Sequence, residues 1–349
     1  MSVGGILHVI PESVMVWTFQ GSYKDTMSRA DWFRSQPTPY RQVVFADDQP
    51  PAGLPPAENV HAILVEYTQF PLVLALLRTR YPGALLAVRA HNIEPLNHFD
   101  AHGCWPPRGP LWMLYGMWQR LRRDMLCKRY ADVIYSISDY ENRVYWSRLP
   151  GRARTLWLPY VSPRCLMPEH PLPHAQRKTI AFMAGDVKVR RSRDGATRFI
   201  RFAETLKAAG APFEFIITGD VSASELPPTQ AVKYTGMIQD LSPLLGQIRA
   251  TAMLSPLGYG FKTSLGDALA AGAYGVVHPT LVRRCPPAFA PGLIPLQVEH
   301  LDRSAEIQRV LQRLEQPFPL VGINRELEMR AFAVLAADFG PSTRSGSSL

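Results

Sequence analysis

Short runs of apolar residues recur along the chain, separated by stretches long enough to hold a helix. Runs rich in valine, isoleucine and leucine are typical of strands buried on both faces of a parallel sheet. The predicted strands are 6–10, 42–46, 62–67, 85–89, 133–136, 155–158, 179–183, 213–218, 232–234, 252–255, 275–278 and 293–296. The predicted helices between them include 70–81, 110–130, 196–209 and 240–249. Strands that alternate with helices predict α/β domains built on doubly wound parallel sheets.

A proline-rich connection divides this pattern into two halves. Prolines stand at positions 159, 163, 168, 171 and 173, which is too dense for a helix or a central strand. Two domains also agree with a chain of 349 residues, since domains average ~150 residues. The predicted divisions are an N-terminal domain at 1–160, a linker at 161–177, a C-terminal domain at 178–322, a last helix at 323–340 that packs back on the N-terminal domain, and a disordered tail at 341–349.

The composition indicates a soluble globular protein, with 46% hydrophobic and 19% charged residues. Its longest apolar runs fall far short of the ~20 residues that a membrane-spanning helix needs. The first ten residues lack the basic start of a signal peptide and are typical of a strand. The four cysteines lie far apart and show no metal-ligand spacing, so no metal site is predicted. A reducing compartment, the cytoplasm, is the simplest expectation.

A glycine-rich loop follows the predicted strand 252–255 and leads into a predicted helix at 263–271. Gly258 and Gly260 allow a tight turn and a close approach of the backbone to a ligand. Lys262 stands beside the free N–H groups of the helix start, an arrangement that favours bound phosphate. Asp267 lies about one turn further along and could hold hydroxyl groups. The loop therefore predicts a ligand with both phosphate and polyol parts.

Two better-known phosphate loops are excluded by their spacing. A P-loop has glycine directly before its Lys-Thr pair, where this chain has Phe261. The dinucleotide-binding fingerprint has a third glycine where Thr263 stands, and it normally follows the first strand of a domain. The local pattern leaves one alternative open, namely a helix-capping turn beside a surface lysine.

Four segments in order carry a family resemblance that the loop alone does not. They are the His91-Asn92-Ile93-Glu94 turn, the Ala131-Asp132 to Glu141 strand and turn, the Thr235-Gly236 to Leu241 segment, and the Gly-x-Gly-x-Lys loop with its following acid, Ala, Leu-Ala and Gly. Together they resemble the retaining GT-B glycosyltransferases of the large family-four type, in the subgroup that carries Gly-x-Gly-x-Lys. The agreement in order and spacing covers about residues 85–280.

This resemblance implies a GT-B architecture, in which two Rossmann-like domains face a central cleft. The N-terminal domain is then expected to bind a glycan or lipid-linked acceptor, and the C-terminal domain a nucleotide-sugar donor. Transfer would retain the anomeric configuration without a metal or other cofactor, because basic side chains and a helix N-terminus neutralise the departing diphosphate.

The resemblance also implies roles for individual residues. The expected catalytic residues are His91, Lys262 and Arg193. The expected donor-binding residues are Gly258, Gly260, Thr263, Ser264, Asp267, Arg190 and Arg191. Asn92 and Glu94 are expected on the acceptor side or in the turn itself. For the three arginines, a solvated basic face is the alternative that the residues leave open, and for His91 it is a structural histidine.

The chain departs from the family pattern at its acidic pair. Asp267 replaces the second glutamate, and Tyr259 stands where the first acid would be. The turn at 9–14 also lacks the glycine pair of many relatives. Two other functions stay open, the second of them because of the changed acidic pair. One is a nucleotide-sugar 2-epimerase, which shares the architecture, and the other is a non-catalytic GT-B subunit that binds nucleotide or scaffolds a partner.

Basic and aromatic residues are interleaved over 105–129, within a chain whose formal net charge is +9. Residues 108–154 hold ten basic side chains against four acidic ones. A helix of this composition suits an anionic membrane surface. It fits a cytoplasmic enzyme that binds peripherally to the inner face of a bacterial membrane and assembles a surface polysaccharide or glycolipid. Nucleic acid is not expected, since no known nucleic-acid module is recognised. An ordinary core-packed helix with a charged outer face is the alternative.

Overall fold

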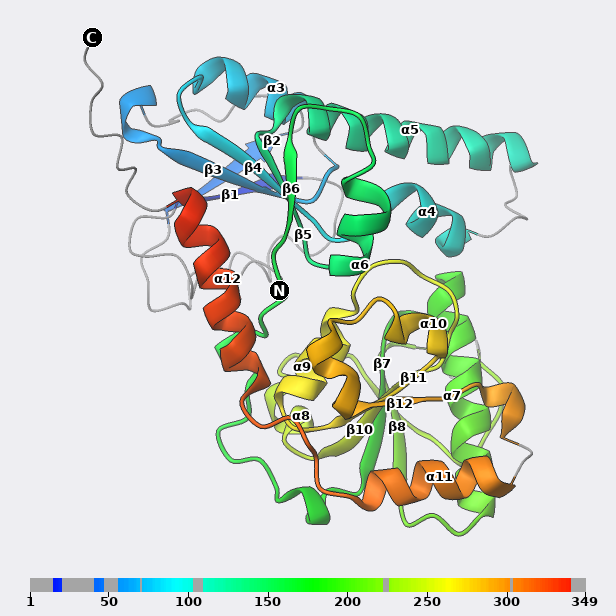
Figure 1. Ribbon diagram of the computed structural model, residues 1–349. Coiled ribbons are helices and arrows are strands. Elements are labelled where there is room, and N and C mark those ends of the chain that lie inside the picture. The colour runs from blue at the N-terminus through cyan, green and yellow to red at the C-terminus, as the bar shows by residue number, and fades with distance from the viewer. Residues whose placement is uncertain are drawn as a thin grey trace.

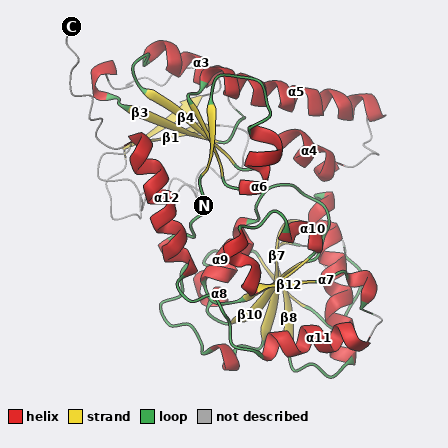
Figure 2. Ribbon diagram, viewed as in Figure 1, coloured by secondary structure: helices red, strands yellow, loops and turns green. Residues whose placement is uncertain are grey.

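The structure is a computed structural model that describes residues 15–20, 41–46, 56–69, 71–102, 109–221, 226–301 and 304–339. Two α/β lobes follow one another along the chain, the N-terminal lobe above the C-terminal lobe in Figure 1. Figure 2 shows strands at the centre of each lobe with helices around them. The fold class predicted from the alternating pattern is therefore confirmed, with parallel strand pairs in every sheet.

The N-terminal lobe is built on a four-stranded parallel sheet in the order β3-β4-β5-β6. Its strands are β3 (Ala62–Glu66), β4 (Leu85–Ala90), β5 (Val133–Ser136) and β6 (Arg154–Trp157). A separate parallel pair consists of β1 (Met15–Gln20) and β2 (Arg41–Ala46). The helices of this lobe are α3 (Pro71–Arg80), α4 (Glu94–His102), α5 (Gly109–Tyr130) and α6 (Asp139–Glu141). β4 and β5 are almost fully buried, as a sheet covered on both faces requires.

The C-terminal lobe has a six-stranded parallel sheet in the order β12-β11-β10-β7-β8-β9. Its strands are β7 (Thr179–Asp186), β8 (Glu214–Asp220), β9 (Lys233–Gly236), β10 (Ile248–Met253), β11 (Tyr274–Val277) and β12 (Leu293–Pro295). Its helices are α7 (Arg190–Ala208), α8 (Ser242–Leu245), α9 (Thr263–Ala270), α10 (Pro279–Val282) and α11 (Ser304–Glu315). A cluster of fully buried aromatic rings, Phe199, Phe202 and Phe215, packs α7 against this sheet.

The last helix, α12 (Ile323–Phe339), runs alongside both lobes in Figure 1. Its buried side chains, such as Leu327 and Leu335, share one apolar cluster with residues of both sheets. Asn324 exchanges two hydrogen bonds with the backbone of Ser162, at 2.9 and 3.1 Å. Near the other end of the helix, Asp338 accepts a hydrogen bond from Tyr135 of β5. Burial of these apolar side chains therefore stabilises the packing of α12 against the N-terminal lobe.

Strand β1 was not predicted, and two elements of the C-terminal lobe differ from the sequence prediction. The helix expected at 240–249 is only the short α8, because β10 already begins at Ile248. The start of this strand was not predicted because it contains Arg249, and a charged residue is not expected in a buried strand. Its guanidinium is stabilised there by backbone carbonyls, including that of Leu314 at 2.5 Å. Helix α7 begins six residues before the predicted 196, because its first turn is polar on all sides and shows no apolar periodicity.

Other predictions fall outside the described residues. These are the strand at 6–10, the turn at 9–14, the first residues of the basic aromatic segment up to 108, and the tail at 341–349.

Candidate functional site

The C-terminal sheet has a switch point between β7 and β10. From β7 the chain continues through α7 to β8 on one side, whereas from β10 it continues through α9 to β11 on the other. The connections after these two adjacent strands therefore diverge, and open α/β sheets bind ligands in the crevice between such connections. The arginines at the start of α7 and the Gly-x-Gly-x-Lys loop at the start of α9 flank this point. The predicted donor residues thus share one edge of the sheet.

Both loop glycines have a left-handed backbone. Gly258 has φ +89° and Gly260 has φ +91°, a region that other residues enter only with strain. A Cβ on Gly260 would clash with the side-chain oxygen of Asn92 and lie 2.8 Å from the carbonyl oxygen of His91. A Cβ on Gly258 would lie 2.7 Å from the Lys262 ammonium. The glycines therefore let the loop touch the His91-Asn92 turn of the other lobe and let Lys262 fold over its own loop.

Carboxylates of the N-terminal lobe hold the backbone of this loop. The N–H of Gly258 donates to Asp100 of α4, with 2.5 Å between nitrogen and oxygen. The N–H of Gly260 donates to Glu141, which is fully buried at the end of α6. On the C-terminal side, Arg284 donates to the carbonyl of Gly258. The loop conformation is thus fixed from both lobes, with its peptide groups satisfied across the interface.

Three cations converge on the same loop. Burial, together with the neighbouring charges of Arg191 and Arg284, lowers the pKa of Lys262 to about 7 against the opposing effect of Glu141 and Asp100. Burial likewise raises the pKa of Glu141 to about 7. Crowded positive charge of this kind is costly in the protein alone and is relieved by an anion. The cluster is suited to neutralising a diphosphate.

The arginines of α7 are not equivalent. Arg191 is half-buried beside the loop, and it donates to Asn97 of α4 in the other lobe. Arg190 and Arg193 are exposed on the first turn of the same helix. Of the three arginines, Arg191 is the one whose charge acts on Lys262. The geometry therefore favours Arg191 over Arg193, the first choice from the sequence, as the partner of Lys262.

His91 lies at the carboxyl end of β4, facing an acid at the end of β3. Its Nε2 is 2.6 Å from a carboxylate oxygen of Glu66, and Arg89 is 3.3 Å from the other oxygen. The ring of Tyr67 stacks on the imidazole, with 4.1 Å between centroids. Glu66 therefore accepts a hydrogen bond from the protonated Nε2 of His91, which leaves Nδ1 as an acceptor in the neutral ring.

The charges around His91 support this protonation state. Burial lowers the pKa of His91 below its ordinary value, against the opposing effect of Glu66. Burial alone would raise the pKa of Glu66, but Arg89 and His91 lower it below its ordinary value. A neutral imidazole oriented by a carboxylate can accept a proton or a hydroxyl hydrogen bond in a reaction.

Asp267 is separated from this charge cluster. It is buried on the second turn of α9, where Tyr160 and Ser162 donate to its Oδ1 at 2.9 and 2.5 Å. Burial raises its pKa to about 6. Its observed partners belong to the segment that connects the lobes, so the structure gives Asp267 a contact with the connection. Thr263 and Ser264 lie half-buried in the first turn of the same helix. The backbone N–H groups of a first turn have no hydrogen-bond acceptor within their own helix.

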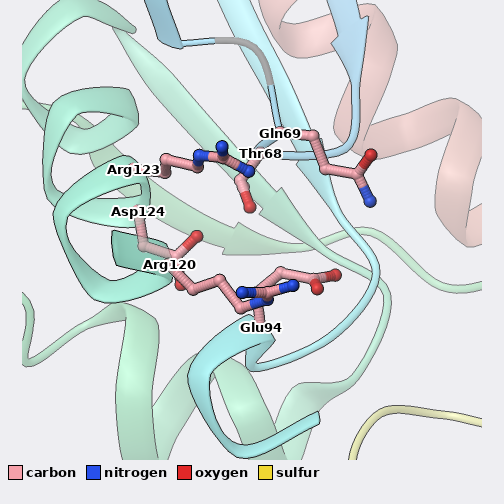
Figure 3. A pocket seen from close by; sticks show the side chains of 6 residues that line it. All are labelled: Thr68, Gln69, Glu94, Arg120, Arg123 and Asp124. Atoms are coloured by element: carbon pink, nitrogen blue, oxygen red, sulfur yellow. The ribbon is translucent and has the colours of Figure 1, made fainter. Parts of the chain in front are cut away.

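The remaining two predicted residues continue the turn after β4. Asn92 lies against the loop at Gly260, and its amide is 3.3 Å from Glu94. Glu94 begins α4 and lines a polar cavity with residues of α5 and of the loop after β3 (Figure 3). Within the described part of the chain, no three histidine, cysteine, aspartate or glutamate side chains group as they would around a metal ion.

Sequence reasoning missed four residues of this site. They are Glu66, Asp100, Glu141 and Arg284. Glu141 stands in one of the segments that carry the family resemblance, so its position was visible although its contact was not. Glu66 is the next-to-last residue of the predicted strand 62–67 and the last residue of β3, and this position was a signal for a residue at the ligand-binding edge. Asp100 and Arg284 lie in helical and turn segments with no motif of their own.

Solved structures with the same arrangement of two lobes identify the fold of this chain. HepE from Anabaena, in complex with UDP and glucose, matches with a TM-score of 0.55 at 12% identity, covering 93% of this chain and 100% of that one. Sucrose-phosphate synthase from Thermosynechococcus elongatus matches with a TM-score of 0.51 at 14% identity, covering 79% and 74%. The chain has the GT-B fold.

TarM matches with a TM-score of 0.51 at 11% identity over 80% of this chain, which spans about half of TarM's own length (52%). These neighbours are GT-B glycosyltransferases. No protein-family model matches the chain, and no curated protein sequence matches it. Similarity at this level of identity establishes the GT-B architecture of the chain, and function has to be argued from the site.

Proposed function

We propose that the chain is a glycosyltransferase that moves a sugar from a nucleotide-sugar donor to a glycan or lipid-linked acceptor, with retention of configuration. One observation carries the proposal: Lys262, Arg191 and Arg284 converge at the switch point of the C-terminal sheet, against the turn that bears His91. HepE was solved with UDP and glucose, and its fold is shared. UDP is therefore the first donor nucleotide to test.

The proposed reaction uses these residues in distinct ways. The bond between the anomeric carbon and the diphosphate breaks, and the acceptor oxygen bonds to that carbon on the same face. The acceptor proton leaves with the released diphosphate. Lys262, Arg191 and the first turn of α9 stabilise the charge on the departing group, which is an electrostatic role that needs no metal. His91, held by Glu66, contacts the transferred sugar.

Donor turnover tests this function directly. The full chain is incubated with UDP-, ADP- and GDP-sugars, and nucleotide release is followed with and without candidate glycan acceptors, while NMR reports the configuration of the product. Release of nucleotide with retained configuration is the expected result. Conversion of the donor sugar to its C2 epimer without acceptor would instead show an epimerase. Binding without turnover across the panel would indicate a non-catalytic subunit.

A membrane surface is the proposed setting for the acceptor. Helix α5 exposes four large apolar side chains on its outer face, Leu111, Leu114, Tyr115 and Trp118. Exposed Arg122 and Arg129 continue along the same helix, so it offers both apolar contact and positive charge to anionic lipid. Among the helices that the structure describes, none is long and apolar enough to cross a bilayer.

Liposome flotation tests the membrane proposal. Wild-type protein is expected to float with vesicles that contain phosphatidylglycerol, and a Leu114→Glu/Trp118→Glu variant is expected to remain in the soluble fraction. Equal recovery of both proteins with the vesicles would remove α5 from the proposal.

A further inference from the structure

The polar cavity that Glu94 lines in the N-terminal lobe lies next to the residues around His91. It has a volume of about 190 Å³ and is lined by Thr68, Gln69, Glu94, Arg120, Arg123 and Asp124. At ~30 Å³ per water molecule, this is room for about six waters or one small polar group. Thr68 directly follows Tyr67, the ring that stacks on His91, and the charge of Glu94 acts on His91 itself. The cavity therefore adjoins the proposed reaction centre.

The deepest group in the cavity is Asp124, whose side chain is fully buried. Its Oδ2 accepts a hydrogen bond from Tyr145 at 2.7 Å. Its Oδ1 is buried and accepts no hydrogen bond of normal geometry from the described residues. Burial raises the pKa of Asp124 to about 7, against the opposing effect of the hydroxyl groups of Thr68 and Tyr145. A buried acceptor of this kind is costly unless a ligand or a water donates to it. Asp124 is therefore ready to accept a hydrogen bond from a ligand hydroxyl.

Two guanidinium groups face the same space. In Figure 3, Arg123 extends near Thr68 on one side, Arg120 lies near Glu94 on the other, and the carboxyl of Asp124 is between them. Arg120 is half-buried and donates to the Gly116 carbonyl at 3.1 Å, which fixes its side chain over the cavity. Paired guanidinium groups recognise phosphate and carboxylate oxygens through several hydrogen bonds at once. The cavity also holds the carboxyl groups of Glu94 and Asp124, so the two guanidinium groups are the part of its lining that can bind an anion.

We propose that this cavity binds an anionic polyol, namely a small sugar or glycerol unit that carries phosphate or carboxylate. The anion lies between Arg120 and Arg123, and a hydroxyl donates to Asp124. Given the proposed glycosyltransferase function, on which this part of the inference rests, the bound unit is the acceptor. Its neighbouring hydroxyl then faces His91. The same chemistry is found in a soluble sugar phosphate and in a phospholipid headgroup.

Titration calorimetry of the full chain tests the cavity with defined probes. Glucose 6-phosphate and sn-glycerol 3-phosphate are compared with glucose and with inorganic phosphate. The phosphorylated polyols are expected to bind at least tenfold more tightly than either glucose or phosphate. Equal affinity for glucose would overturn the anion part, equal affinity for inorganic phosphate would overturn the hydroxyl part, and no binding of either polyol would overturn the whole.

Variants place the binding in this cavity. Arg123→Ala is a surface change and should weaken glycerol 3-phosphate binding at least tenfold, and Arg120→Ala/Arg123→Ala should abolish it. Arg80→Ala, an exposed arginine of the neighbouring helix α3, is the matched control and should bind as the wild type does. Lys262→Ala should also keep this binding, because the donor loop is elsewhere. Loss in Lys262→Ala, with no change in the Arg120/Arg123 variant, would contradict the proposal.

Two further experiments are needed. One distinguishes a lipid headgroup from a soluble ligand, and the other tests the cavity and the donor site independently. Phosphatidylglycerol vesicles that compete with glycerol 3-phosphate for the wild type would identify a lipid headgroup, whereas their failure to compete would identify a soluble unit. UDP is titrated into the same variants. Intact UDP binding with no polyol binding refutes the cavity alone, and polyol binding with no nucleotide binding refutes the donor assignment alone.

Discussion

The two lobes carry opposite charge on the walls where they meet. The C-terminal wall presents Lys262, Arg191 and Arg284, whereas the N-terminal wall presents carboxylates, including Asp100 and Glu141. The basic wall holds the groups that can neutralise a diphosphate, but the acidic wall holds the peptide groups of its loop in place. The Gly-x-Gly-x-Lys loop lies in one domain but therefore depends on the other domain for its conformation. Mutations can separate the two contributions.

The largest effect is expected from the basic wall. Lys262→Ala should lower donor turnover about 100-fold or more, because one preorganised group that stabilises developing charge is worth that much. Steady-state kinetics with the active nucleotide-sugar measures it. Arg201→Ala, an exposed arginine further along α7, should leave turnover unchanged. Unchanged turnover in Lys262→Ala would refute its role.

The contact between the walls is tested by Gly260→Ala. The new Cβ meets Asn92 and the His91 carbonyl, and the backbone has φ +91°, so the free energy of unfolding should fall by about 2 kcal/mol or more. Urea unfolding measures the loss. Gly236→Ala is the control, since its backbone also has a positive φ of +69° but a Cβ there meets nothing within 4 Å. Equal stability of the two variants would mean that the lobes do not constrain the loop.

The charge state of Lys262 predicts a pH dependence of nucleotide binding. Its pKa is about 7 in the free protein, and a bound diphosphate must raise it. Binding therefore takes up a proton above pH 7, and the affinity should fall by up to about tenfold per pH unit as pH rises from 7 to 9. Lys262→Arg, which stays charged throughout this range, should bind with little pH dependence. Parallel slopes for the two proteins would contradict the assignment.

The acidic wall should give the smallest change. Glu141→Ala leaves the Gly260 N–H without its acceptor, which is a loss of about 1–3 kcal/mol for a buried donor, so nucleotide affinity should fall about tenfold or more. Glu141→Gln keeps an acceptor oxygen and should stay close to the wild type. Calorimetry distinguishes the two, and a Gln variant as weak as the Ala variant would show that the charge, and not the hydrogen bond, matters.

The sequence predicted the elements well where strands are almost fully buried. The strands at 133–136 and 85–89 correspond closely to β5 and β4, because short continuous runs of branched apolar residues are typical of strands buried on both faces. It was wrong where polar residues serve a tertiary contact. Arg249 in β10 and the arginine-rich start of α7 broke the apolar pattern, and only the folded chain supplies their partners.

For the site, the sequence located the loop and His91 but could not rank the arginines. Arg190, Arg191 and Arg193 lie within four residues of one another, and their positions around the first turn of α7 determine that Arg191 is the one beside the loop. Asp100 and Glu141 could not be found as loop ligands, because each meets its glycine across the two lobes, 158 and 119 residues apart in the chain. Asp267 has the motif position from which a contact with a ligand hydroxyl was predicted. In the structure, its hydrogen-bond donors are Tyr160 and Ser162.

The most direct test of the central claim compares a nucleoside diphosphate with its parent nucleoside. UDP and uridine are titrated into the wild type and into Lys262→Ala, with ADP/adenosine and GDP/guanosine as further pairs. For the pair that binds, the wild type should prefer the diphosphate at least tenfold, about 1.4 kcal/mol, and Lys262→Ala should lose most of that preference. An equal preference in both proteins would show that the Gly-x-Gly-x-Lys loop does not hold the diphosphate.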